Sequence, residues 1–123
     1  MKKIIVLCLI TLSVSCHLLQ EKGIAFKITN SAEFPITDVK ISTSENLESV
    51  TFASIQKNES QEGFLSMKDN KMDGDYTLSY TRKDGSTAAI SSGYYTNGGA
   101  LDNYTRFEIT NDSTLVKFGE FPH

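Results

Sequence analysis

The stretch that decides the fold of this chain is GDYTLSYT, residues 74–81. Tyr76, Leu78 and Tyr80 occupy alternate positions, and threonine or serine fills each position between them. A period of two places the three large side chains on one face of an extended strand, and the hydroxyl groups on the other. The stretch therefore predicts a half-buried β-strand.

The same alternation recurs on both sides of this strand. It is seen around residues 24–28, 36–41, 50–55, 64–67, 88–95, 105–109 and 114–118. Asp84-Gly85 and Asn97-Gly98 lie between such segments and predict hairpin turns, because both dipeptides readily adopt positive φ. No segment long enough for a helix repeats apolar residues at i, i+3 and i+4, which is the pattern of an amphipathic helix. We therefore predict an all-β fold, a single antiparallel β-sandwich of about seven or eight short strands, with a small barrel as the alternative.

The succession of short strands resembles immunoglobulin-like and transthyretin-like sandwiches. The resemblance is one of architecture, and architecture of this kind carries no function with it.

The first fifteen residues predict a cleaved signal peptide. Residues 1–3 are Met-Lys-Lys, an apolar run of about nine residues follows, and small residues occupy 13–15. The run is about half as long as the ~20 residues that a membrane-spanning helix needs. A basic head, a short apolar run and small residues at the exit are typical of a bacterial export signal.

Residues 13–16, Ser-Val-Ser-Cys, resemble the lipobox of bacterial lipoproteins. The resemblance implies that Cys16 becomes the first mature residue and carries the acyl chains, typically palmitate, of a lipid anchor. Ser13 stands where the lipobox usually has leucine, so ordinary secretory cleavage that leaves Cys16 unmodified is the alternative. We expect residues 1–15 as signal peptide, 16–22 as lipidated cysteine and tether, and 23–123 as the sandwich domain.

The predicted location is the cell envelope, with the protein held to a membrane by its lipid. His17 follows the cysteine, so the aspartate that marks inner-membrane retention in enteric bacteria is absent. This favours the outer membrane, and both its periplasmic and its surface face remain open.

The charge of the chain argues against nucleic acid or an anionic lipid as a partner, and the sequence shows no local basic cluster. The formal net charge is −3, and loss of Lys2 and Lys3 with the signal takes it to about −5. Nucleic-acid binding is driven by Lys and Arg that neutralise phosphates. Cys8 leaves with the signal and Cys16 is predicted to be acylated, so the mature chain has no disulfide. We expect a monomer without a cofactor.

Tyr94, Tyr95 and Asn97, together with Tyr104, are the candidate binding residues. Tyrosine is favoured in contact surfaces, and here it stands beside a tight Asn-Gly turn. The alternative is that one tyrosine packs in the core and the other covers a neighbouring strand.

The segment 69–75 is the densest acidic stretch, and Asp69, Asp73 and Asp75 are weak candidates for binding Ca²⁺. Lys71 occupies a position where an EF-hand loop needs a ligand, so a solvated loop without metal is the expectation.

Catalysis has few suitable residues in this sequence. The two histidines are His17, beside the predicted anchor, and His123, the last residue printed. We therefore expect no catalytic residues and predict a small binding module for a protein or a glycan. The alternatives are an envelope immunity or structural lipoprotein and, less favoured, a small secreted hydrolase.

Overall fold

The fold consists of β-strands throughout the part that the structure, a computed structural model, describes, which is residues 22–119. The strands are β1 (Gly23–Asn30), β2 (Ile36–Thr43), β3 (Ser49–Ile55), β4 (Ser60–Ser66), β5 (Gly74–Thr81), β6 (Thr87–Thr96), β7 (Gly99–Ala100), β8 (Tyr104–Ile109) and β9 (Thr114–Gly119). Within this range, no helix is long and apolar enough to cross a membrane. The predicted signal peptide, Cys16 and nearly all of the tether lie outside the described residues.

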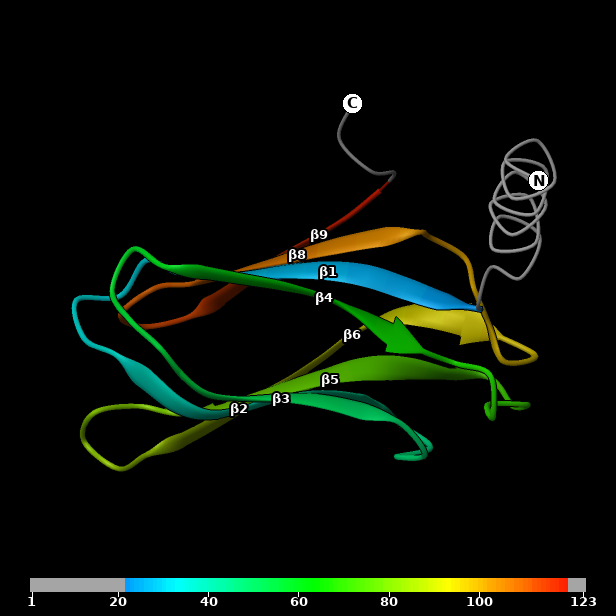
Figure 1. The fold of residues 1–123 in the computed structure, drawn as a ribbon, viewed down its shortest axis with the longest axis horizontal. Helices are drawn as coiled ribbons and strands as arrows, with labels where there is room; N and C mark the ends of the chain where they lie inside the picture. Colours follow the sequence, from blue (N-terminus) through cyan, green and yellow to red (C-terminus); the bar gives the residue numbers. More distant parts are fainter. Residues whose placement is uncertain (1–21, 120–123) are drawn as a thin grey trace, which may run out of the picture.

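The strands form two stacked sheets, which confirms the predicted all-β sandwich (Figure 1). One sheet has the order β4-β1-β8-β9, and the other has the order β3-β2-β5-β6-β7. The stretch GDYTLSYT is β5, in the middle of the second sheet. Its Tyr76, Leu78 and Tyr80 are buried, and the residues between them lie on the outer side at intermediate exposure.

One strand pair departs from the predicted antiparallel arrangement. β1 and β8 run parallel, with Ala25 opposite Tyr104 and Asn30 opposite Ile109. Every other strand pair in the described range is antiparallel. The order also differs from that of the immunoglobulin sandwich, because an immunoglobulin domain keeps its first two strands in one sheet. Here β1 and β2 belong to opposite sheets.

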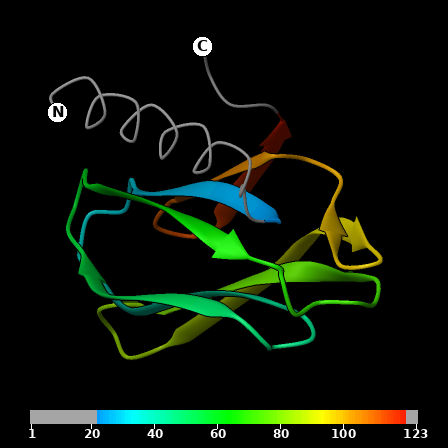
Figure 2. The same ribbon diagram turned by 45° about the vertical axis from the view of Figure 1, so that its right-hand side comes forward.

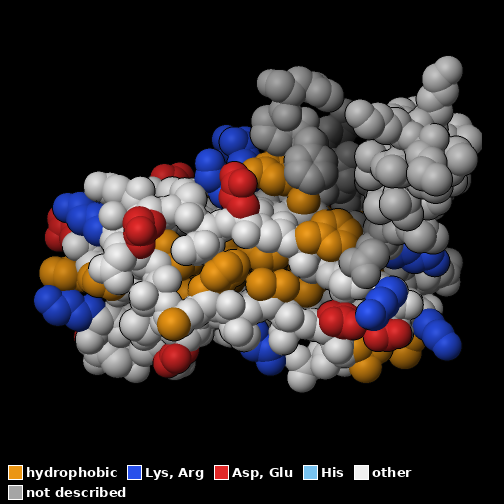
Figure 3. Space-filling view, viewed as in Figure 1, with side chains coloured by type: hydrophobic (Ala, Val, Ile, Leu, Met, Phe, Trp, Pro, Cys, Tyr) orange, Lys and Arg blue, Asp and Glu red, His pale blue; other side chains and the backbone are white. Residues whose placement is uncertain are grey.

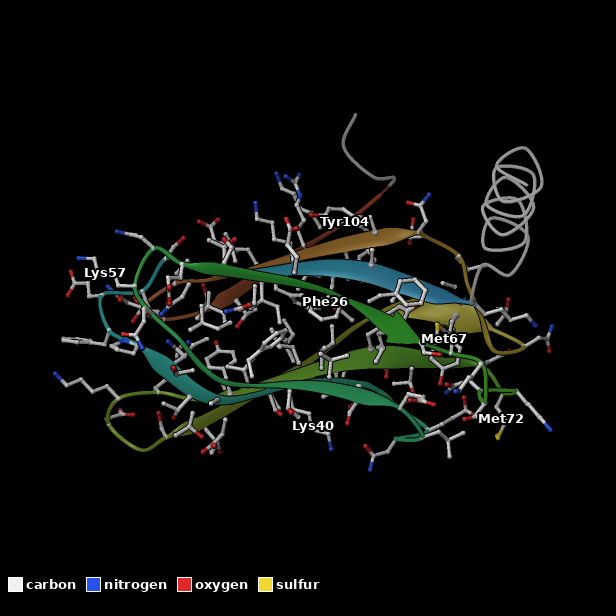
Figure 4. All side chains as sticks on the ribbon, viewed as in Figure 1. Phe26, Lys40, Lys57, Met67, Met72 and Tyr104 are labelled. Atoms are coloured by element: carbon white, nitrogen blue, oxygen red, sulfur yellow. The ribbon has the colours of Figure 1, made fainter. Side chains whose placement is uncertain are left out.

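The core lies between the sheets and is filled by the alternate residues of each strand. Phe26 of β1 points into this space (Figure 4) and meets Phe52 of β3 edge-on, with ring centroids 6.1 Å apart. The fully buried side chains come from both sheets, and the largest are Tyr76, Tyr80, Tyr95, Phe26 and Phe107. Where β3 and β4 face each other, apolar side chains are visible between the sheets (Figure 3).

Both predicted hairpin turns are present. Asn97 and Gly98 have φ of 49° and 71°, and Thr96 pairs directly with Gly99, which is the two-residue turn that Asn-Gly favours. Gly85 has φ of 87° and donates its backbone N–H to the carbonyl of Arg82. The second turn is therefore a longer loop closed by a left-handed glycine.

The loops gather at two opposite ends of the sandwich, and Figures 1 and 2 agree on this division. The near end is where β1 begins, and it carries the β2–β3, β4–β5, β6–β7 and β7–β8 connections. The far end carries the β1–β2, β3–β4, β5–β6 and β8–β9 connections. Met72 marks the near end and Lys57 the far end in Figure 4. Any segment that precedes Lys22 therefore joins the molecule at the near end.

Candidate functional site

Tyr94 and Tyr95 lie on opposite sides of β6, so the two rings do not form one surface. Tyr95 is fully buried, and its hydroxyl donates to Oε2 of Glu45 at 2.8 Å. The buried amide of Asn70 lies 3.3 Å from the same hydroxyl and also donates to Thr43 Oγ1 at 3.0 Å. The ring of Tyr95 therefore belongs to the core, and its hydroxyl fixes two near-end loops to each other.

The carboxylate of Glu45 accepts hydrogen bonds from both Asn70 and Tyr95. The side chain of Asn70 and then the hydroxyl of Tyr95 donate to its carboxylate, and both hold the pKa of Glu45 below its ordinary value. The carboxylate therefore joins the β2–β3 loop to the β4–β5 loop while it is ionised.

Tyr94 and Asn97 are brought together by the acidic loop. Tyr94 is 49% exposed, and its hydroxyl donates to Oδ2 of Asp73 at 3.2 Å. The other oxygen of Asp73 accepts the backbone N–H of Asn97 at 2.9 Å. The hydrogen bond to the Asp73 carboxylate, and its charge, raise the pKa of Tyr94. Tyr104 lies apart from this group, on the outer side of the other sheet, and is 8% exposed (Figure 4).

The acidic segment 69–75 was the candidate site for Ca²⁺. Residues 22–119 contain no group of three or more His, Cys, Asp or Glu side chains placed to hold a metal ion. Asp73 is engaged by Tyr94 and Asn97, as described, and the exposed Asp69 lies in the same loop. The backbone N–H of Asp75 donates to Ser44 Oγ at 3.1 Å, which fixes the start of β5.

A groove at the far end was not predicted from the sequence. It has a volume of about 470 Å³ and is lined by Ala32, Phe34, Pro35, Ile36, Arg82, Lys83, Asp84 and Asn111. We call it the far-end groove. Ala32 and Ile36 are buried and form its apolar floor, whereas Phe34 is 46% exposed. The volume falls within the range typical of ligand pockets, about 300–1,000 Å³.

The aromatic wall of the far-end groove is held from below by a buried amide. Asn30 is fully buried, and its Nδ2 donates to the carbonyls of Phe34 at 2.9 Å and Ile55 at 3.0 Å. Its Oδ1 accepts the backbone N–H of Ala32 at 3.0 Å. Asn30 therefore closes the β1–β2 loop and presents the exposed ring of Phe34.

The basic side of the far-end groove comes from the β5–β6 connection. The Nζ of Lys83 lies 4.1 Å from the centroid of the Phe34 ring, a cation–π contact. Arg82 donates to the carbonyl of Thr110 at 2.9 Å and to the hydroxyl of Tyr80 at 3.0 Å. The carboxylate of Asp84 accepts hydrogen bonds from the hydroxyl and the backbone N–H of Ser86, and these bonds lower the pKa of Asp84. The groove thus combines an apolar floor with two cations.

A second basic feature lies on the outer face of the β4-β1-β8-β9 sheet. Lys27 is the register partner of Arg106, and Arg106 is the register partner of Lys117. We call these three residues the basic row. Figure 3 shows Lys and Arg side chains grouped over this sheet. The three residues are far apart in the sequence, and only the pairing of β1 with β8 and β9 brings them together.

Comparisons with known proteins add support for the fold. No protein-family model matches this chain, and no curated protein matches it significantly. A solved structure described as "NMR structure of the protein from Eubacterium rectale" matches with a TM-score of 0.52 and 12% sequence identity. The match covers 81% of this chain and 91% of that chain. The chain is thus similar to that protein in fold, and the class defined so far is a small β-sandwich.

Proposed function

We propose that this protein is a bacterial cell-envelope lipoprotein whose β-sandwich is a small non-catalytic binding module. Support for the cell-envelope location comes from the signal-like residues 1–15 and from Cys16, which ends a lipobox-like segment. Residues 16–22 extend to at most about 25 Å, so an acylated Cys16 would keep the sandwich close to its membrane.

The observation that carries the binding function is the far-end groove. It lies at the end of the sandwich opposite the start of β1, so an anchor attached through Lys22 leaves it unobstructed. Phe34 keeps nearly half of its surface exposed although the loop that carries it is fixed by Asn30. An ordered, exposed aromatic ring that shares a groove with an arginine is typical of the central part of protein interfaces.

The chemistry of the groove favours a protein partner over a neutral glycan. Ala32, Phe34, Pro35 and Ile36 offer apolar surface, on which an aliphatic or aromatic side chain would pack. Lys83 has no carboxylate within 4.0 Å among residues 22–119. A partner segment that carries an apolar residue beside an acidic one fits both features.

Site-specific photo-crosslinking in intact cells tests this function. A photoreactive residue at Phe34 should give one dominant protein adduct, and the same residue at Ala89, exposed on the outer face of β6 and outside the groove lining, should not. The Lys83→Glu substitution should reduce the adduct about tenfold, because it reverses the charge that an acidic partner meets. Equal adducts at both positions, or an adduct indifferent to Lys83→Glu, would contradict the proposed site. A glycan adduct would exclude the protein partner.

The membrane anchor is tested separately by intact mass. The mature protein isolated from membranes should begin at Cys16 and carry acyl chains, and a Cys16→Ala variant should be unprocessed. An unmodified Cys16 in a protein released from membranes would contradict the anchor and leave the crosslinking result unaffected.

A further inference from the structure

The basic row places three positive charges directly beside one another. Neighbouring strands lie about 4.8 Å apart, so the row from Lys27 through Arg106 to Lys117 spans about 10 Å between its outer members. Like charges directly opposite each other in a sheet are destabilising. The arrangement stands out in a chain whose formal net charge is −3.

Little negative charge within the described residues compensates the row. Glu62 lies 4.0 Å from Lys27, and both side chains are substantially exposed, so this pair contributes little. Glu108 lies on the same face but accepts a hydrogen bond from Ser31 at 2.8 Å, near the far end. Arg106 and Lys117 have no carboxylate within 4.0 Å in the range 22–119.

The surface at the row is hollowed and partly apolar. A depression of about 310 Å³ is lined by Lys27, Thr29, Arg106, Phe107, Glu108, Leu115 and Lys117. Leu115 is 52% exposed on β9, and Phe64 is 42% exposed on β4, at the other edge of the same sheet. The planar guanidinium of Arg106 can bind phosphate oxygens in a bidentate manner. Phosphate-binding cations between exposed apolar residues match the boundary of headgroups and acyl chains in a membrane.

The position of the row suits a membrane reached from the start of β1. Lys27 is four residues from Gly23, which is about 13 Å along the strand. The segment 16–22 spans at most about 25 Å, so a lipid on Cys16 can enter the same bilayer that this face touches. The far-end groove then lies at the side of the molecule and stays accessible.

We propose that the outer face of the β4-β1-β8-β9 sheet binds the phosphates of anionic phospholipid headgroups through the basic row, so that the sandwich lies on its side against the membrane. This inference rests on the membrane anchor of the proposed function. It is independent of the partner in the far-end groove.

Single-tryptophan reporters test the orientation, because the chain contains no tryptophan. The processed full chain would carry Leu115→Trp and be reconstituted in vesicles of phosphatidylcholine with or without phosphatidylglycerol, both with brominated acyl chains. With phosphatidylglycerol, emission from residue 115 should shift to the blue and be quenched at least threefold. Phe34→Trp, at the far end, should remain unquenched. No quenching at residue 115, or equal quenching at both positions, would overturn the proposal.

Charge variants test the role of the row. Combined Lys27→Gln, Arg106→Gln and Lys117→Gln should abolish the quenching at residue 115. The matched control neutralises Lys40, Lys57 and Lys68, which lie elsewhere, and should leave the quenching unchanged. If both sets act alike, overall charge and not the row is responsible, and the proposal fails. Displacement by inorganic phosphate but not by chloride of equal ionic strength would assign the row to free phosphate, which also overturns it.

A missing anchor can be told apart from a missing lipid-binding face. If intact mass shows an unmodified Cys16, the processed soluble protein is added to phosphatidylglycerol vesicles and sedimented. The triple variant should then bind about 100-fold more weakly than the unsubstituted protein, since each cation near an anionic surface contributes about fivefold. Equal sedimentation of both proteins would overturn the proposal even though the anchor had failed for its own reasons.

Discussion

The Asn30→Asp substitution is the sharpest test of how the far-end groove is held in place. The side chain keeps its shape, but the group that donates to two carbonyls becomes a carboxylate oxygen. In the unsubstituted protein, Nδ2 of Asn30 lies 2.9 Å from the carbonyl oxygen of Phe34 and 3.0 Å from that of Ile55. In the variant, a carboxylate oxygen would face these two carbonyls. The remaining oxygen could still accept the N–H of Ala32.

The size of the effect follows from these contacts. Each buried acceptor left without its donor costs about 1–3 kcal/mol, and two are affected. Asn30 is fully buried, so an ionised carboxylate there adds a desolvation cost. We expect the free energy of unfolding at pH 7 to fall by about 4 kcal/mol. In a domain of this size that lowers the midpoint of thermal unfolding by roughly 20 °C.

The loss should depend on pH in a definite direction. Burial and the two carbonyls disfavour the charged form, so the folded-state pKa of the carboxyl introduced at position 30 is raised above its unfolded value of about 3.9. A raised carboxyl pKa makes the folded state relatively most stable while the group is protonated, below about pH 3.9. The difference from the unsubstituted protein should therefore grow by about 1.4 kcal/mol per pH unit above that point, until the folded-state pKa is reached.

Urea unfolding of both proteins from pH 4 to pH 7 measures this difference. Asn111→Asp is the matched control, because Oδ1 of the exposed Asn111 accepts the N–H of Glu33 at 2.8 Å, which a carboxylate also does. The control should lie within about 0.5 kcal/mol of the unsubstituted protein. A small, pH-independent change for Asn30→Asp would refute the assigned hydrogen bonds.

Two further predictions concern the loops and the near end. Gly98→Ala should lower the free energy of unfolding by about 3 kcal/mol, because φ is positive and the new Cβ would overlap the carbonyl oxygen of Asn70. Gly85→Ala, where φ is also positive but the new Cβ meets open space, should cost only about 1 kcal/mol. Similar thermal midpoints for the two variants would contradict the packing argument. Glu45→Gln should lower the thermal midpoint at pH 7, and by less at pH 3. Because the pKa of Glu45 is depressed, its ionised carboxylate stabilises the fold at pH values above 4.5, its ordinary pKa. That stabilisation is lost as the pH falls through the folded-state pKa. A difference of the same size at both pH values would contradict it.

The strands were predictable because each carries its own alternation, and this signal is local. The segments around 24–28, 74–81 and 105–109 became β1, β5 and β8 for this reason. β7 has only two residues, too few for a period to show. A β-bulge near Asp38, which has φ of 49°, was also missed, since no glycine marks it. The pairing of strands, including the parallel pair, depends on contacts distant in the sequence, which alternation does not encode.

The candidate sites were harder to predict for the same reason. Adjacent residues of a regular strand point to opposite faces, so a period of two already favours the alternative in which one tyrosine packs in the core, and Tyr95 is the buried one. The basic row and the far-end groove could be predicted only by knowing which strands pair and in which register. Lys27 and Lys117 are ninety positions apart in the chain, and no local pattern relates them. The apolar Phe34-Pro35 pair, placed just before a strand, was the one local signal of the groove.

The central place of β1 also governs how the molecule responds to force. A pull transmitted through Lys22 acts along β1, which is paired with β4 over Gly23–Thr29 and with β8 over Ala25–Asn30. The bonds to β4 lie across that direction and those to β8 are slanted to it, so they are loaded together in shear and do not open one after another from an end. Forced unfolding is governed by the rate of unfolding, and we expect bonds that are loaded together to lower that rate. The strand that meets the incoming chain is therefore the one best placed to bear tension between an attachment on one side and a captured partner on the other.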